Sequence, residues 1–137
     1  MRVFLDTNVF VDMFLKREDA QFNIDAADIY RTSLQSETYQ LCVSPISIAT
    51  SFYLGRKDPL AVEHMKSILK KVVPLQVDER DVRFALSSKM EDKEDAMQLS
   101  CAKGCGCDVI ITRDEKHFEE STIPVLTPEQ FLRYALK

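Results

Sequence analysis

The chain has 137 residues, of which 45% are hydrophobic and 29% are charged, and its formal net charge is −4 at pH 7. This composition excludes a disordered chain, and the short apolar runs exclude a membrane-spanning one, so we expect a single domain over residues 1–137. The acidic balance also argues against a protein that coats duplex nucleic acid by charge alone, since that needs a basic surface.

The first predicted elements follow one another without a turn. Residues 2–6 are an apolar run that ends in Asp6, which predicts a buried strand. The apolar spacing of residues 9–15 predicts a helix directly after it, with Asn8 as its N-cap. The polar stretch 16–23 predicts a loop.

The rest of the chain continues to alternate. Pro74 predicts that its strand lies at an edge of the sheet, Gly104 predicts a helix end, and Thr127 with Gln130 predicts a capping box. We predict strands at 39–43, 72–77, 109–112 and 124–126, and helices at 24–36, from Ser44, at 59–71, 78–88 and 93–103, and from Thr127.

Strands that alternate with helices predict an α/β fold, a three-layer sandwich with a central, mostly parallel sheet flanked by helices. The runs V-F-L and V-I-I are typical of central parallel strands, which are buried on both faces. Ligands of such sheets bind at the carboxyl ends of the strands. Asp6 and Asp114 follow these two runs, so we expect both carboxylates at that edge.

A third acidic cluster lies at residues 90–98, before a predicted helix. Asp95 precedes small and apolar residues at helical spacing, so it should lie near the buried face, and Asp92 could point to the same place. For Glu91, Asp92 and Glu94 taken singly, the preference of acids for helix N-termini is the competing explanation.

Three carboxylates that converge at one sheet edge would repel one another. Arg113 adjoins Asp114, but neighbouring side chains of a strand point to opposite sides. A hard divalent cation, Mg²⁺ or Mn²⁺, takes oxygen ligands, and it could activate a water and stabilise charge on a phosphodiester.

The ordered motifs D-T-N (6–8), D-A (95–96) and T-R-D (112–114), followed by Phe118, resemble the PIN domain family. The closing I-P-V-L-T-P-E-Q-F-L (123–132) resembles the end of one bacterial subfamily. Bacterial members of the family are mostly VapC-like toxin ribonucleases of toxin–antitoxin pairs. The resemblance implies an RNA substrate, an antitoxin partner, a homodimer and a Mg²⁺ or Mn²⁺ cofactor.

Carried over by motif, the resemblance also implies the site residues. The metal-holding and catalytic carboxylates would be Asp6, Asp95 and Asp114. The auxiliary polar groups would be Asn8, Asp92, Glu94 and Thr112. Arg113 and Lys116 flank the acids and are our candidates for contacts with substrate phosphates.

One position departs from the family pattern. PIN domains usually carry a glutamate on the helix after the second strand, whereas residues 44–53 offer Thr50 or Ser51, and a hydroxyl cannot supply the missing charge. The leading hypothesis is a divalent-metal-dependent endoribonuclease, and the alternative is a PIN fold with a weakened site that binds RNA or protein. An aspartate-nucleophile phosphatase is disfavoured, because it needs an acid where Asn8 stands.

The cysteines and histidines carry weaker signals. Cys101, Cys105 and Cys107 lack the paired spacing of a zinc site, and without a signal segment they predict reduced thiols in the cytoplasm, with no membrane association. His117 lies near the acids in sequence, and a surface position is favoured over contact with a substrate.

Overall fold

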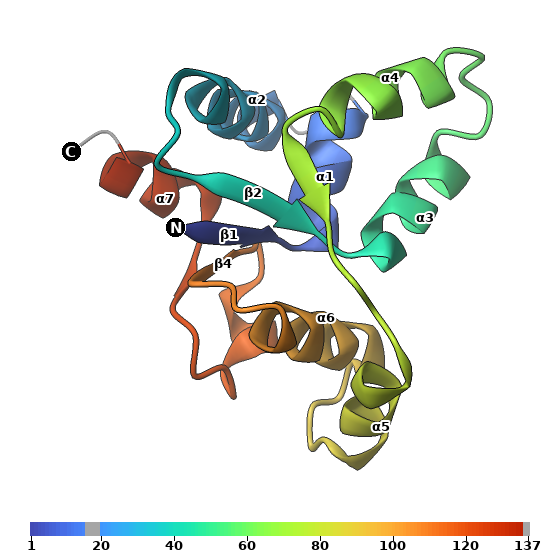
Figure 1. Cartoon of the computed structure of the whole chain (residues 1–137), viewed down its shortest axis with the longest axis vertical. Coiled ribbons are helices and arrows are strands. Elements are labelled where there is room, and N and C mark those ends of the chain that lie inside the picture. Colours follow the sequence, from blue (N-terminus) through green and yellow to red (C-terminus); the bar gives the residue numbers. More distant parts are fainter. Residues whose placement is uncertain (16–19, 136–137) are drawn as a thin grey trace.

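The computed structural model describes residues 1–15 and 20–135. Its centre is a five-stranded sheet in the order β3-β2-β1-β4-β5, and all neighbouring strands run parallel (Figure 1). The strands are β1 (Arg2–Leu5), β2 (Gln40–Val43), β3 (Val72–Pro74), β4 (Val109–Ile111) and β5 (Val125–Leu126).

Helices cover both faces of the sheet, which confirms the predicted three-layer α/β fold. Figure 1 shows α1, α2, α4 and α7 on one side of the sheet and α5 and α6 on the other. Each side has its own hydrophobic cluster, and η1 contributes to the cluster of α5 and α6. The helices are α1 (Thr7–Phe14), α2 (Ala20–Gln35), α3 (Pro45–Leu54), α4 (Ala61–Ile68), α5 (Glu79–Ser87), α6 (Lys93–Gly104) and α7 (Pro128–Ala135), and η1 is a 3₁₀ helix (Glu115–Phe118).

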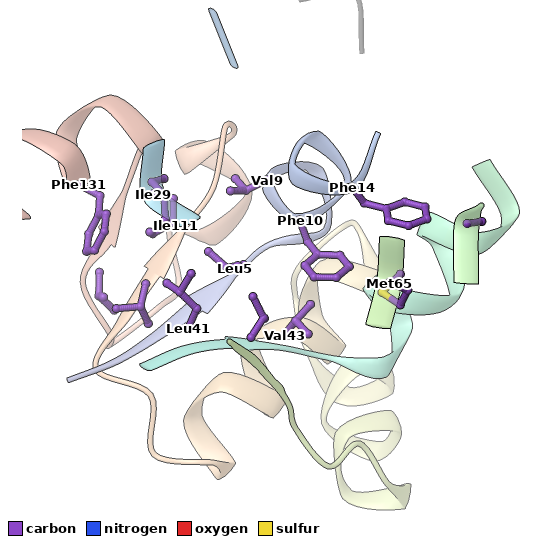
Figure 2. Packing of buried hydrophobic residues seen from close by; sticks show 14 residues of the cluster. Leu5, Val9, Phe10, Phe14, Ile29, Leu41, Val43, Met65, Ile111 and Phe131 are labelled. Carbon is purple, nitrogen blue, oxygen red and sulfur yellow. The ribbon is translucent and has the colours of Figure 1, made fainter. Parts of the chain in front are cut away.

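The alternation of side chains along the strands explains why both faces are apolar. In β1, Leu5 packs into the cluster of α1, while Phe4 packs into the cluster of α6, and both are fully buried. Figure 2 shows Leu5 and Ile111 facing the helix that carries Val9 and Phe10. Burial of one such side chain stabilises the fold by about 1.5–3 kcal/mol, which fixes the central strands and their ends.

Several local predictions are confirmed and two are wrong. The strand with Pro74 lies at the sheet edge, and the Thr127–Gln130 capping box is formed by bonds of 2.9 and 3.2 Å. The helix after β1 begins at Thr7 with Asp6 in the N-cap position, so Asn8 is not the cap. No helix in residues 1–15 or 20–135 is long and apolar enough to cross a membrane.

The predicted loop 16–23 is wrong over its second half, because α2 already begins at Ala20; residues 16–19 lie outside the described ranges. Two contacts stabilise this first turn. Gln21 donates to Asp25 at 2.9 Å, and the guanidinium carbon of Arg113 lies 4.1 Å from the centroid of the Phe22 ring. Neither contact is visible in a window of polar residues.

The carboxyl ends of β1 and β4 lie side by side, and this arrangement creates the candidate site. The Asp6 N–H donates to the carbonyl of Ile111 at 2.9 Å, and Thr112 N–H donates to Leu126 of β5 at 3.0 Å. Residues 6 and 112–114 are therefore neighbours at one edge of the sheet.

Candidate active site

Asp6 is a buried acid with one unpaired oxygen. Only 4% of the residue is exposed. Its Oδ2 accepts a 2.8 Å hydrogen bond from the Thr112 hydroxyl, whereas Oδ1 is buried and has no partner with hydrogen-bond geometry among the described residues. Burial raises the pKa of Asp6, the Thr112 bond opposes that shift, and the charges of Glu94 and Asp114 add to it.

The Thr112 hydroxyl holds the two strand ends together. It donates to Asp6 and accepts the backbone N–H of Asp114 at 3.1 Å. Asp114 itself is exposed, directly before η1. The structure therefore places both strand-end aspartates at the same sheet edge.

Asp95 reaches the same edge from the first turn of α6. Its side chain is 13% exposed, and its Oδ2 lies 3.0 Å from Nδ1 of His117 without the alignment of a hydrogen bond. The pKa of Asp95 is raised to about 7, chiefly by burial; the charges of Asp6 and Asp92 contribute to this increase, and His117 opposes it. The His117 side chain is 53% exposed, in the surface position that the sequence favoured.

Asp92 is engaged in holding the helix. Its carboxylate is the N-cap of α6 and accepts the N–H of Asp95 at 3.1 Å. Asn8 is the second residue of α1 and is half-buried. Of the predicted auxiliary groups, Thr112 is the one bonded to Asp6 itself.

Glu94, in the first turn of α6, contacts the first residue of α1. Its Oε1 lies 3.3 Å from the hydroxyl of Thr7, which also contacts Ser47 Oγ and Gln98 Nε2, each at 2.8 Å. Gln98 also donates to Ser47 at 2.8 Å and accepts from Ser44. We did not predict this network from the sequence. Gln98 was a usable signal, because it lies three residues after Asp95 in a helix whose other buried residues are small or apolar.

Thr50 and Ser51 bring no charge to this edge. The Thr50 hydroxyl donates to the carbonyl of Ile46 at 3.0 Å, and the buried Ser51 hydroxyl donates to the carbonyl of Ser47 at 2.8 Å. Both bonds stay within α3, four residues back along the helix.

The two candidate phosphate-binding residues lie in different surroundings. Arg113 forms an ion pair with the buried Asp12 at 3.2 Å, and its guanidinium stacks on Phe22. Lys116 lines an open hollow of about 540 Å³ between the start of α6 and η1, together with Asp95 and His117.

The donor set fits a hard divalent cation. Within the described ranges no three His, Cys, Asp or Glu side chains form a ready-made metal-holding group. Mg²⁺, however, commonly takes one or two carboxylates and keeps its waters. The buried, unpaired oxygen of Asp6 and the mutual repulsion of the acids match that demand.

The four cysteines are free thiols, Cys42, Cys101, Cys105 and Cys107.

Comparisons with known proteins agree with this geometry. A family model for the PIN domain matches residues 2–116. The chain is 29% identical to Ribonuclease VapC1 of Aquifex aeolicus (strain VF5), over 95% of this chain and 92% of that protein. Its fold is similar to that of a chain in a toxin–antitoxin complex from Klebsiella pneumoniae, with a TM-score of 0.66, 22% identity, and coverage of 92% of this chain and 97% of that one.

A second solved structure gives the same result. A chain of VapBC2 from Rickettsia felis, bound to a DNA fragment from its promoter, matches with a TM-score of 0.63 at 15% identity. The match covers 92% of this chain and 97% of that chain.

Proposed function

The chain belongs to the PIN domain family, and from that premise we propose that it is a divalent-metal-dependent endoribonuclease, the toxin of a toxin–antitoxin pair. One observation carries the proposal: Asp6 is buried at the carboxyl edge of the sheet, and one of its oxygens has no partner in the described residues. Burial of a charged group without a partner is costly, so this position favours a cation from outside the chain.

In the proposed reaction, Asp6, Asp95 and Asp114 would hold Mg²⁺ or Mn²⁺, in part through waters that the cation keeps. When bound, the cation supplies an activated water and neutralises charge on the phosphodiester. The Thr112 hydroxyl bonds both to the Asp6 carboxylate and to the backbone N–H of Asp114, so it fixes the positions of the two aspartates relative to each other. Lys116, which lines the hollow, is our candidate for contact with a substrate phosphate as a point charge.

Cleavage of a mixed RNA pool tests the proposal. We expect purified protein to cleave RNA with Mn²⁺ or Mg²⁺, to stop with chelator, and to lose cleavage in Asp95→Asn. The matched control is Asp28→Asn, which changes an exposed aspartate on α2 paired with Arg31. Full cleavage by Asp95→Asn would remove Asp95 from the site.

A binding module is the second candidate, and the hydroxyls of Thr50 and Ser51 favour it, because neither adds charge to the site. It predicts that the folded chain binds RNA with or without chelator and leaves it intact. Gel-shift and cleavage assays on the same RNA pool therefore separate the two functions.

The proposed partners are an antitoxin and a second copy of this chain. The similar structures include toxin–antitoxin complexes, which supports the first. An exposed apolar surface supports a protein contact: Tyr53, Leu54, Leu60 and Val62 are 42–64% exposed around the α3–α4 connection. Light scattering of the purified chain, with Tyr53→Ser as the variant, measures whether this surface joins two copies.

A further inference from the structure

We infer that Glu94 is a further carboxylate of the acid site, and that Thr7, Ser47 and Gln98 position it through a directed hydrogen-bond network. This inference rests on the proposed function. It adds Glu94, on α6, as a fourth carboxylate of the site. The hydroxyls of α1 and α3 serve only to position that carboxylate.

The protons of the network can be assigned from its contacts. Gln98 Nε2 has two protons, and they meet the oxygens of Thr7 and Ser47, each at 2.8 Å, while Gln98 Oε1 accepts from Ser44. In the described parts of the chain, Thr7 is the one acceptor within reach of the Ser47 hydroxyl, so Ser47 donates to Thr7. Thr7 then accepts twice, and its single proton remains for Glu94 at 3.3 Å.

The opposite orientation of the amide does not satisfy these contacts. If Gln98 donated to Ser44, its oxygen would take the protons of both Thr7 and Ser47. The 2.8 Å contact between the two hydroxyls and the 3.3 Å contact to Glu94 would then lack a proton. The network therefore has one direction, and it ends on the Glu94 carboxylate.

The burial of the network explains its effect on Glu94. Gln98, Ser44 and Ser47 are all 0% exposed, so each of their polar atoms needs a partner. Because Thr7, Ser47 and Gln98 belong to α1, α3 and α6, side chains from three different helices fix the direction of the Thr7 proton. Glu94 is exposed, yet this proton holds its carboxylate at the sheet edge.

Two further observations connect Glu94 to the cation site. Glu94 contacts Thr7, the residue that directly follows Asp6, and it directly precedes Asp95 in the chain. The Asp6 oxygen without a partner is buried at the same edge. Preference of an acid for a helix N-terminus accounts for the position of Glu94 in the first turn but not for its contact with Thr7.

Mn²⁺ binding to the full chain, measured by the EPR signal of free Mn²⁺, tests the inference without an activity assay. We expect Glu94→Gln and Thr7→Val each to weaken Mn²⁺ binding by about 10-fold or more, in the range typical of groups that orient metal ligands. Thr7→Ser keeps the hydroxyl and should bind as the wild type does. Adding Thr7→Val to Glu94→Gln should weaken binding no further.

The control is Glu63→Gln, an exposed glutamate in the first turn of α4 that pairs with Lys66. Circular dichroism melting verifies that each variant is folded. Unchanged Mn²⁺ binding in Glu94→Gln, with binding lost in Asp6→Asn, would overturn the inference and leave the proposed function standing. A wild-type chain that binds no Mn²⁺ would overturn both.

Discussion

Two aspartates six positions apart, Asp6 and Asp12, are equally buried, each 4% exposed, but the fold treats them differently. Asp12, on α1, is paired with the guanidinium of Arg113 at 3.2 Å. Asp6 has the Thr112 hydroxyl on one oxygen, and on the other no hydrogen-bond partner in residues 1–15 or 20–135. Within the described residues, the chain therefore supplies a counter-charge for Asp12 and none for Asp6, which in the proposed function would take its counter-charge from a bound cation.

Arg113 makes this comparison sharper, because it is adjacent in sequence to the exposed Asp114. Its charge is used between α1 and α2, where it meets Asp12 and the ring of Phe22 at 4.1 Å. The cation closest in sequence to the acid site is therefore engaged elsewhere. Its proposed contact with substrate phosphate would have to compete with Asp12.

The largest expected effect comes from Asp6→Asn. The amide keeps the size of the side chain and can still accept from Thr112, but it removes the charge that would hold the cation. We expect metal-dependent RNA cleavage to fall by about 100-fold or more, as for the loss of several kcal/mol of metal assistance. Cleavage rates at saturating Mn²⁺ measure this, and an unchanged rate would contradict the role of Asp6.

The second effect is on stability and comes from Asp12→Ala. The change leaves a half-buried Arg113, 24% exposed at its side chain, without its carboxylate. We expect the free energy of unfolding to fall by about 2 kcal/mol, below the value for fully buried pairs because Arg113 is partly solvated. Urea denaturation measures the change.

Its control is Asp28→Ala, where the carboxylate pairs with Arg31 on the surface. That variant should lose no more than about 0.5 kcal/mol, as exposed ion pairs do. Equal losses in the two variants would mean that burial of Asp12 adds nothing to its ion pair.

A third, smaller effect concerns pH. In the folded chain the pKa of Asp95 is raised from 3.8 to about 7, so between these values the folded state binds more protons than the unfolded state. The stability that protonated Asp95 contributes to the metal-free chain is fully present below the lower value and should be lost as pH rises through about 7. Urea midpoints in chelator at pH 6 and pH 8 test this, and Asp95→Asn should flatten the dependence.

The smallest expected effect comes from Phe22→Leu, which keeps the Arg113–Asp12 ion pair and removes the ring beneath the guanidinium. We expect a loss of about 0.5–1 kcal/mol, the usual strength of such a contact near the surface. A loss as large as that of Asp12→Ala would show that the ring, rather than the carboxylate, holds Arg113.

The sequence predicted what depends on local pattern. The apolar runs before Asp6 and Asp114 indicated parallel strands whose ends meet, and the structure has that arrangement. The alternation of strand residues likewise predicted that Arg113 and Asp114 point apart. The partner of Arg113 is Asp12, 101 positions away in the chain. This pair could not be predicted, because no local pattern records which helix covers which strand end.

The same limit applies to the start of α2 and to the Gln98 network. Residues 20–23 look like a loop because their composition is polar, and the contact of Phe22 with Arg113 forms only in the folded chain. Gln98 has partners 91 and 51 positions earlier, so its function as the centre of a polar network depends on how the tertiary fold brings three helices together at the sheet edge. Its helix was predicted, but its bonds were not.

The bond between Asp6 and Thr112 also has a consequence for the order of folding. It joins residues 106 positions apart, and β1 pairs with β4 at an equally long separation. Contacts of such long range form late, because closing the intervening loop is entropically unfavourable until other structure has shortened it. During synthesis, the Asp6–Thr112 bond can therefore form only after almost the whole chain has been made. A nascent or truncated copy that lacks β4 would contain Asp6 but no assembled site.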